Sequence, residues 1–250
     1  MRKNRSLELF LMFGFAAALA VGGCAKKEAQ APAASNEATA PTPTGGGKIP
    51  VTTASAEAKT EFLQGRDMVD KLLITDSVVH FQKAVALDPL STATRRALGV
   101  QYAKYGRLDD AVAELHAALD LNPKAGAVHS ALCDIRLRQG RTAEALTEAE
   151  LEAIPILRLT SIAIVRHTLG HAADSDAALS EVITDHASIA AYDIAQVYAW
   201  RGEVDHAFEW LVRAYAQRDT GMPLLATDRL LAPLHDDPRW SPFIKKMGFG

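Results

Sequence analysis

The sequence of 250 residues has no surplus of basic side chains. Its 27 Lys and Arg residues stand against 30 Asp and Glu residues, which gives a formal net charge of −3. A domain that binds nucleic acid usually has a pI above about 9, because its surface must attract phosphates. The composition therefore argues against a nucleic-acid partner.

Motifs that mark common enzyme and cofactor sites are also missing. The sequence contains no HExxH, no CxxC and no GxSxG, and its glycine run at 45–47 lacks the preceding strand and following helix of a phosphate-binding loop. His167 and His171 are four residues apart, but His171 falls in an expected turn and need not share a helix face with His167. We therefore expect no catalytic residue, no metal and no cofactor. An enzyme with an unfamiliar kind of site is the weakest alternative.

Long apolar runs are scarce, and the prominent one lies at the start of the chain. Residues 9–21 are almost entirely apolar and follow three basic residues within positions 2–5. This run is shorter than the ~20 residues that span a bilayer, and its charged start is typical of a secretory signal. It ends at two glycines followed by Cys24, an arrangement that resembles the lipobox of bacterial lipoproteins. In that family the cysteine sulfur receives a diacylglycerol, the signal is cut before it, and the new amino group is acylated.

This resemblance implies that residues 1–23 are a signal peptide and that Cys24 attaches the mature protein to a membrane. One acyl chain holds a protein only marginally, whereas several together anchor it stably. Ala25, rather than Asp, follows Cys24, which in the lipoprotein sorting rule implies the outer membrane, facing the periplasm. The alternative is an ordinary signal peptide with an incidental cysteine. With Cys24 lipidated, Cys133 has no partner for an internal disulfide.

Residues 24–57 comprise this cysteine and a segment rich in Ala, Pro, Thr, Ser and Gly. Such a segment has too little large apolar surface to offset the entropy lost on ordering. We expect it to be a disordered stalk between the lipid and the folded part.

From residue 58 to 219 the sequence repeats with a period close to 34. Pro89 and Pro123 are 34 residues apart, and so are Gly106 and Gly140, each of which precedes an arginine. The period and the small-residue pattern resemble the tetratricopeptide repeat, a pair of helices joined by a turn. The second unit carries the pattern most fully, in Leu98, Gly99, Tyr102, Gly106, Ala111, Leu115, Ala118 and Pro123.

The resemblance implies an all-α fold, a superhelix of helix-turn-helix repeats that must stack because one unit cannot bury its apolar face alone. The third unit is looser, with Cys133 in place of the small glycine and Pro155 arriving early. Residues 220–250, interrupted by prolines, are expected to cap the stack. Five units are expected, at about 58–91, 92–125, 126–155, 156–187 and 188–219, and the capping side chains are expected to be Leu230, Leu231, Leu234, Trp240, Phe243 and Ile244.

The last two units resemble one bacterial group of tetratricopeptide modules. The resemblance rests on the segments 191–202, 207–211, 218–219 and 236–240. Modules of that group often follow winged-helix regulators, cyclase domains or serine/threonine kinases, and the likeness implies a role in protein contact. We expect no effector domain from this sequence, so the regulatory output of those proteins is not implied.

In superhelices of this family the first helix of each unit lines an inner groove in which peptides lie. The groove of this chain is expected to be cationic in its first three units and to offer aromatic and amide groups in the fifth. Arginine can hold a carboxylate through two hydrogen bonds, and Trp and Tyr are common anchors, so the pattern predicts a peptide with acidic groups at one end and an apolar anchor at the other. The alternative is that these side chains are solvated helix faces. The Lys/Asn clamp of chaperone-binding relatives is not evident, so capture of a C-terminal peptide is not implied. The predicted groove residues are Arg66, Arg96, Lys104, Asp134, Arg138, Tyr192, Gln196 and Trp200.

Together these features predict a non-catalytic, lipid-anchored interaction scaffold or assembly factor in the bacterial envelope. Its layout resembles that of tetratricopeptide lipoproteins that assist outer-membrane barrel assembly, pilus biogenesis or the organisation of peptidoglycan enzymes. The alternative is an envelope sensor or regulator whose groove binds a ligand or peptide and which signals through a partner.

Overall fold

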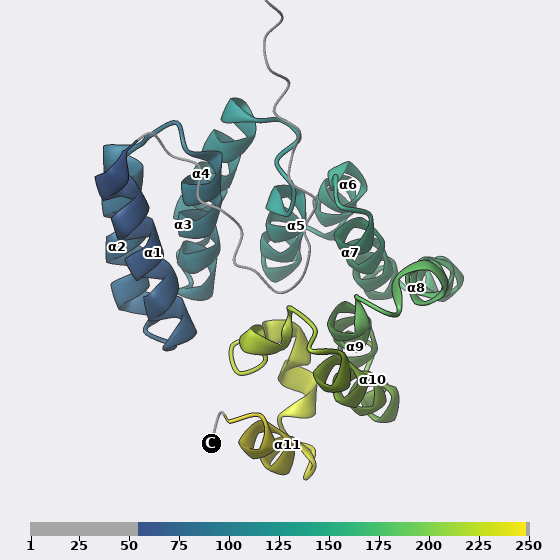
Figure 1. Cartoon of the computed structure of the whole chain (residues 1–250). Helices are drawn as coiled ribbons and strands as arrows, with labels where there is room; N and C mark the ends of the chain where they lie inside the picture. Colours follow the sequence, from purple (N-terminus) through teal and green to yellow (C-terminus); the bar gives the residue numbers. More distant parts are fainter. Residues whose placement is uncertain (1–54, 249–250) are drawn as a thin grey trace, which may run out of the picture. The chain divides into compact units, whose positions relative to one another are not determined.

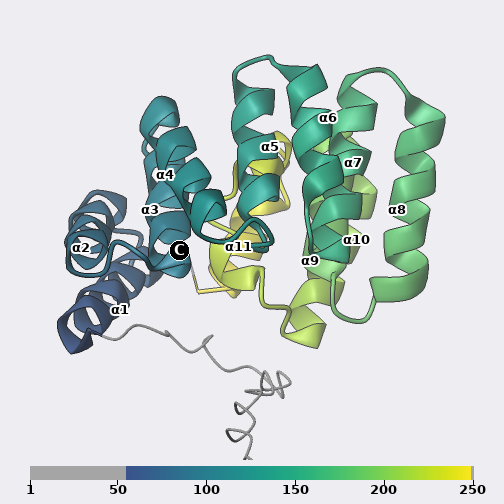
Figure 2. The same ribbon diagram turned by 90° about the horizontal axis from the view of Figure 1, so that it is seen from above.

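The computed structural model describes residues 55–248, and every regular element within them is a helix (Figures 1 and 2). The predicted signal peptide, Cys24 and the stalk up to residue 54 lie outside the described residues. Of the helices in the described range, none is both long enough and apolar enough to span a bilayer. The predicted all-α repeat fold is confirmed.

Ten of the helices form five consecutive antiparallel pairs, and the first helix of each pair faces the inside of the curve that the pairs follow (Figure 1). We call this inner side the concave face. The pairs are α1 (Ala56–Asp70) with α2 (Ile74–Leu87), α3 (Thr92–Lys104) with α4 (Leu108–Leu121), α5 (Val128–Arg138) with α6 (Thr142–Leu151), α7 (Pro155–Thr168) with α8 (Ala172–His186), and α9 (Ala191–Trp200) with α10 (Val204–Gln217).

The turn inside each pair needs one residue with a left-handed backbone. In pairs two to five that residue is glycine, with φ between +71° and +83°, as at Gly106 and Gly140. Glycine adopts this conformation without a steric penalty because it has no Cβ. In the first pair Leu72 takes the same place at φ +61°, and its side chain is 44 % exposed.

Close approach of the two helices in a pair explains the small residues of the repeat. A Cβ added at Gly99 would lie 2.8 Å from Leu115 Cγ and 3.1 Å from the carbonyl oxygen of Ala111. Between pairs the larger residues make the contact, and Gln82 Nε2 donates a hydrogen bond to Tyr102 Oη at 2.7 Å. Glycine at position 99 is therefore required by packing.

A polar contact with a glutamate links the two helices at the same place in each of the first three units. Arg95 Nη1 lies 2.9 Å from Glu114 Oε2 in the second unit. The corresponding pairs are Glu61–His80 and His129–Glu148, both at 2.7 Å, and in all three the partners are 19 residues apart.

The third unit ends differently from the prediction. Pro155 does not terminate that unit but is the first residue of α7, where a missing N–H costs nothing. Glu152, which is only 1 % exposed, accepts hydrogen bonds from the backbone N–H of Ala127 and Ser130 at 2.9 Å and of Ile154 at 3.0 Å. Its carboxylate thus caps α5 from across the unit and fixes the short connection to α7.

The start of the folded region also differs slightly from the prediction. Ser55 Oγ accepts a hydrogen bond from the N–H of Ala58 at 3.1 Å, which is the usual role of a serine at a helix N-cap. As a result α1 begins at Ala56, two residues before the expected first unit.

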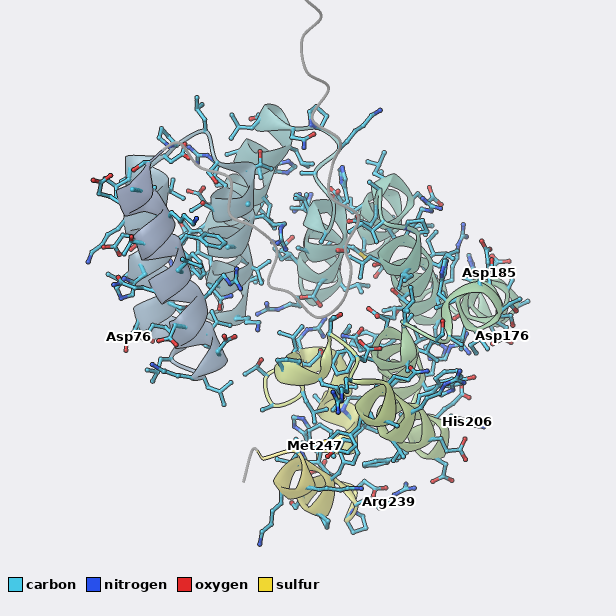
Figure 3. The ribbon with its side chains drawn as sticks, viewed as in Figure 1. Asp76, Asp176, Asp185, His206, Arg239 and Met247 are labelled. Atoms are coloured by element: carbon cyan, nitrogen blue, oxygen red, sulfur yellow. The ribbon has the colours of Figure 1, made fainter. Side chains whose placement is uncertain are left out.

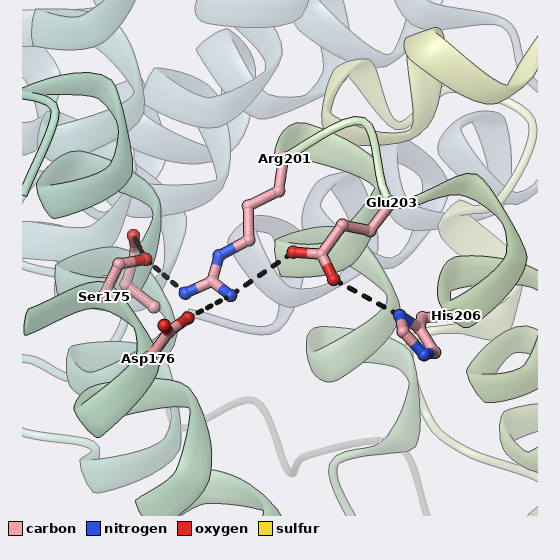
Figure 4. A network of polar contacts seen from close by, with 6 residues as sticks. Ser175, Asp176, Arg201, Glu203 and His206 are labelled. Carbon is pink, nitrogen blue, oxygen red and sulfur yellow. Dashed lines mark hydrogen bonds and ion pairs between the residues drawn. The ribbon is translucent and has the colours of Figure 1, made fainter. Parts of the chain in front are cut away.

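The last two units are joined by a polar network around one arginine (Figure 4). The Arg201 side chain, 6 % exposed, donates to Asp176 at 2.9 Å and to Ser175 Oγ at 2.5 Å. Glu203 lies 3.5 Å from the same guanidinium and 3.2 Å from His206 Nδ1. The turn of the fifth unit is thereby held against the second helix of the fourth.

After α10 the chain forms two short 3₁₀ helices, η1 (Met222–Leu224) and η2 (Arg229–Leu234), and the helix α11 (Trp240–Lys246). Four of the expected capping side chains join a buried cluster with residues of α9 and α10. They are Leu231, Leu234, Trp240 and Phe243.

Candidate functional site

The predicted groove residues lie on the first helices of four pairs. α1 carries Arg66, α3 carries Arg96 and Lys104, α5 carries Asp134 and Arg138, and α9 carries Tyr192, Gln196 and Trp200. Five of them contact residues 227–229, at the start of η2 on the concave side of the repeats. These five are Lys104, Asp134, Tyr192, Gln196 and Trp200.

Asp228 is the central acceptor of this contact. Its Oδ2 accepts hydrogen bonds from Tyr192 Oη at 2.8 Å and from Gln196 Nε2 at 2.5 Å, while its Oδ1 accepts from the N–H of Leu230 at 2.9 Å. Burial raises the pKa of Tyr192, and the charge of Asp228 adds to the effect, so the phenol remains a donor. Asp228 therefore caps η2 and joins it to α9.

The neighbouring Arg229 connects the same segment to α5 and to the end of α9. Its guanidinium forms an ion pair with Asp134, 95 residues earlier in the chain, and its Cζ lies 5.2 Å from the centre of the Trp200 ring. Trp200 Nε1 in turn donates to Thr168 Oγ1 at 2.9 Å. Arginine over an aromatic face is a favourable contact that a lysine would reproduce poorly.

A cavity of about 540 Å³ lies between these residues and the helices α3 and α5. Lys104 and Arg138 contribute cationic groups from α3 and α5, and Arg229 contributes a third from the C-terminal segment. Lys104 Nζ reaches Thr227 Oγ1 at 3.3 Å, and Arg138 Nη1 donates to the carbonyl oxygen of Ala103 at 2.6 Å. Burial lowers the pKa of Lys104, and the charge of Asp228 opposes that effect. The cavity thus combines helix surface from two repeat units with a wall supplied by the C-terminal segment.

The remaining predicted groove residues lie away from this segment. Arg66 Cζ is 6.0 Å from the centre of the Phe62 ring on its own helix. Arg96 lines a second cavity of about 400 Å³ near the start of α3. Burial lowers the pKa of Arg96, and the nearby Glu152 carboxylate opposes that effect. Of the eight predicted residues, five therefore contact residues 227–229, Arg138 lines the same cavity, and Arg66 and Arg96 lie nearer the first repeats.

Other charged side chains lie on the outer face of the repeats. In Figure 3 the side chains of Asp176 and Asp185 on α8 and of His206 on α10 point outward, away from the concave face. Asp185 is exposed and provides a reference position for experiments on the outer surface.

Sequence reasoning did not find Thr227, Asp228 and Arg229. The 34-residue register ends at about residue 219, so it assigns no face to the residues that follow. Their partners lie 32 to 123 residues away in the chain, and no local pattern predicts such contacts. The single available signal is the position of an aspartate before the apolar pair Leu230-Leu231, which suits the N-cap of a short helix.

Residues 55–248 hold no group of three or more His, Cys, Asp or Glu side chains suited to a metal ion. Cys133, the cysteine within this range, is buried between helices. Burial raises the pKa of its thiol to about 12.

Comparison with known proteins identifies the repeat. The tetratricopeptide-repeat family model matches residues 102–155. The crystal structure of PilW, described as a widely conserved type IV pilus biogenesis factor, is similar with a TM-score of 0.52 and 13 % identity, over 78 % of this chain and 93 % of that chain. PilF of Pseudomonas aeruginosa is similar with a TM-score of 0.50 and 15 % identity, over 76 % of this chain and 90 % of that chain. No curated protein sequence matches the chain. At these identities the likeness concerns the fold.

Proposed function

Because the chain is a tetratricopeptide-repeat protein, we propose that it is a non-catalytic scaffold that binds a protein partner at its concave face and is held at the bacterial envelope by lipid on Cys24. Proteins built from this repeat bind other proteins, and the repeat supports an interaction or assembly role. The observation that carries the proposal is the cavity between α3, α5 and residues 224–230. It combines apolar helix surface, which can hold an apolar side chain, with Lys104 and Arg138, which can hold an acidic one.

The attachment to the envelope rests on the sequence of residues 1–24. A basic start, a short apolar run and a cysteine behind two glycines form the signal of a lipoprotein. We place the mature protein on the outer membrane, facing the periplasm, because Ala25 follows the cysteine. In this arrangement the repeats would organise a partner close to the membrane.

The lipid can be tested directly with a Cys24→Ser variant. Cells grown with labelled palmitate should incorporate the label into the wild-type chain, and the label should be lost in the variant. The variant should also move from the membrane fraction to the soluble fraction. Equal labelling of both chains would contradict lipidation at Cys24.

The partner site can be tested by photo-crosslinking in cells. A photoreactive residue placed at Ala131 would lie in the cavity wall, and one at Asp185 would lie on the outer face. Gln196 is a poorer choice, because its side chain donates to Asp228 and its replacement would disturb the segment. A protein identified by mass spectrometry from the Ala131 chain alone supports binding at the concave face. Equal trapping from both positions would argue against it.

A further inference from the structure

Part of the concave face is permanently covered by the chain's own C-terminal segment. Leu225, Leu231 and Leu234 are fully buried in a cluster with α9 and α10. Gly221 packs so closely on α9 that an added Cβ would lie 2.2 Å from Tyr192 Cδ1. Release of the segment would return all of this apolar surface to water. Residues 221–234 are therefore a fixed wall of the concave face and do not act as a removable lid.

This wall ends the concave face at the fifth unit and leaves the cavity in front of α3 and α5. At about 540 Å³ the cavity lies within the range of sites that hold a ligand or several side chains. Much of its lining is apolar and comes from α3, α5, the start of α2 and the segment itself. The apolar lining residues are Ile74, Val100, Ala103, Ala131, Leu224 and Leu230.

The two acidic groups in the cavity wall are already engaged. Asp134 forms an ion pair with Arg229. Asp228 accepts hydrogen bonds from Tyr192 and Gln196. Neither carboxylate is therefore available to bind a cationic group of a partner without losing an existing contact.

The two cations on the α3 and α5 side are in a different situation. Among the described residues, no carboxylate lies within ion-pair distance of Lys104 or Arg138. Lys104 contacts the hydroxyl of Thr227, and Asp228 acts on it only at longer range. Arg138 donates to the carbonyl of Ala103, and both cations line the same cavity. The unbalanced charge of the cavity is therefore positive.

We propose that this cavity binds an acidic and aliphatic peptide segment of the partner protein, an inference that rests on the proposed function. An aliphatic side chain of the peptide lies against Val100, Ala131 and Leu230. A carboxylate from the same segment pairs with Lys104 and Arg138, which offer charge-assisted hydrogen bonds. The fixed wall prevents the peptide from continuing along the fifth unit.

The chain's own segment shows how such a sequence docks. Residues 224–228 read Leu-Leu-Ala-Thr-Asp, two aliphatic residues followed by an acid. Leu225 is buried in the apolar cluster while the Asp228 carboxylate accepts hydrogen bonds from α9. A partner segment of the same character would occupy the remaining part of the concave face in the same manner.

The test uses the full chain in detergent micelles and fluorescent synthetic peptides of about ten residues, which reach about 33 Å when extended. One peptide carries a Leu-Leu-Glu-Glu core, a second replaces both Glu residues by Lys, and a third replaces both Leu residues by Ser. Fluorescence anisotropy should give an affinity for the first peptide that is at least about tenfold higher than for either control. Equal binding of the three peptides, or no binding of the first at about 1 mM, would overturn the proposal.

Variants of the chain locate the binding. Lys104→Gln and Arg138→Gln should each weaken binding of the acidic peptide by about tenfold, because each removes one charge-assisted contact. Ala131→Phe should weaken it by filling the cavity, with circular dichroism and the melting temperature showing that the variant is folded. Lys83→Gln removes an exposed lysine on α2 and should have no effect. Unchanged binding in both charge variants would overturn the proposal, and so would equal competition by free phosphate, which would indicate a general anion site.

The experiments distinguish failure of the acidic-peptide inference from failure of the proposed concave-face function. If the acidic peptide does not bind but a photoreactive residue at Ala131 still traps one protein in cells, the partner has another chemistry and only this inference is wrong. If trapping from Ala131 is also no stronger than from Asp185, the concave-face function itself is wrong.

Discussion

The Asp228 carboxylate accepts a hydrogen bond from the Tyr192 phenol at 2.8 Å, across 36 residues of chain. Through this contact the segment that follows the last repeat becomes part of the concave face. Arg229 extends it to Asp134 of the third unit. A partner therefore meets a composite surface of helices and segment, which differs from an uninterrupted groove.

Removal of the Asp228 carboxylate should loosen the C-terminal segment. Asp228→Ala leaves Tyr192 and Gln196 without their acceptor, and we expect a loss of about 1–3 kcal/mol in the free energy of unfolding. Tyr192→Phe removes one donor and should cost about 1 kcal/mol. Urea unfolding measures both, with the exposed Asp236→Ala as the control. Equal stability of Asp228→Ala and that control would contradict the assigned contact.

Glu152 should be among the residues that matter most for stability. Its buried carboxylate accepts three backbone hydrogen bonds, from Ala127, Ser130 and Ile154. Glu152→Ala leaves those donors unsatisfied and removes the charge that faces Arg96, so we expect a loss of about 2–4 kcal/mol. Denaturant unfolding tests this against Glu181→Ala, an exposed glutamate on α8. A loss no larger than in the control variant would refute the capping role.

Asp193 should make the stability of the fold depend on pH. Burial, reinforced by the charge of Asp219, raises its pKa to about 7, although its own backbone N–H has the opposite effect. In the unfolded chain the pKa is about 3.9, so between these values the folded form alone holds the proton. The stability is then greatest below the unfolded pKa and falls as the pH rises toward about 7.

Asp193→Asn should remove this loss. The variant should exceed the wild type in stability at pH 8 by roughly 1–3 kcal/mol, with a smaller difference near pH 5. Urea midpoints measured from pH 5 to pH 8 provide the comparison. A constant difference across that range would show that Asp193 does not titrate as described.

Cys133 should be unreactive in the folded protein. Its thiol is buried, and burial raises its pKa to about 12, with Asp134 adding to the shift and Ser161 opposing it. The reactive thiolate is therefore scarce at pH 8. In a Cys24→Ser chain, Ellman's reagent should react slowly until denaturant is added. Rapid reaction without denaturant would contradict the buried position.

The sequence predicted the structural roles of residues that follow the 34-residue period, but not the roles of residues that depart from it. Gly106 marks a turn and Gly99 marks a close helix contact, because the repeat fixes both positions. Pro155 was assigned to the wrong unit, since proline both follows a helix and begins one. The early position of Pro155 indicates that the third unit is short, but the sequence pattern does not reveal how its end is fixed, because that depends on Glu152 reaching across to α5.

The candidate site divides in the same way. The helical phase places Lys104, Asp134 and Arg138 on the inner helices. It does not reveal that Asp134 is paired with Arg229, because that contact joins residues 95 apart. The proposed recognition depends on the positive charge that is not paired within the cavity. That charge follows from such long-range pairings, so it could not be predicted from the sequence.

Replacement of Leu72 by glycine should stabilise the repeat region. It occupies the turn position that glycine takes in the other four pairs, with φ +61° and an exposed side chain. A non-glycine residue in this conformation is strained by roughly 1–2 kcal/mol, and the flexibility that glycine adds to the unfolded chain costs about 0.5–1 kcal/mol, so Leu72→Gly should raise the free energy of unfolding by about 0.5–1 kcal/mol. Leu73 is equally exposed but has φ −89°, so Leu73→Gly should give no gain. Thermal and urea unfolding of the two variants measure the difference, and equal effects would show that the left-handed turn at Leu72 carries no strain.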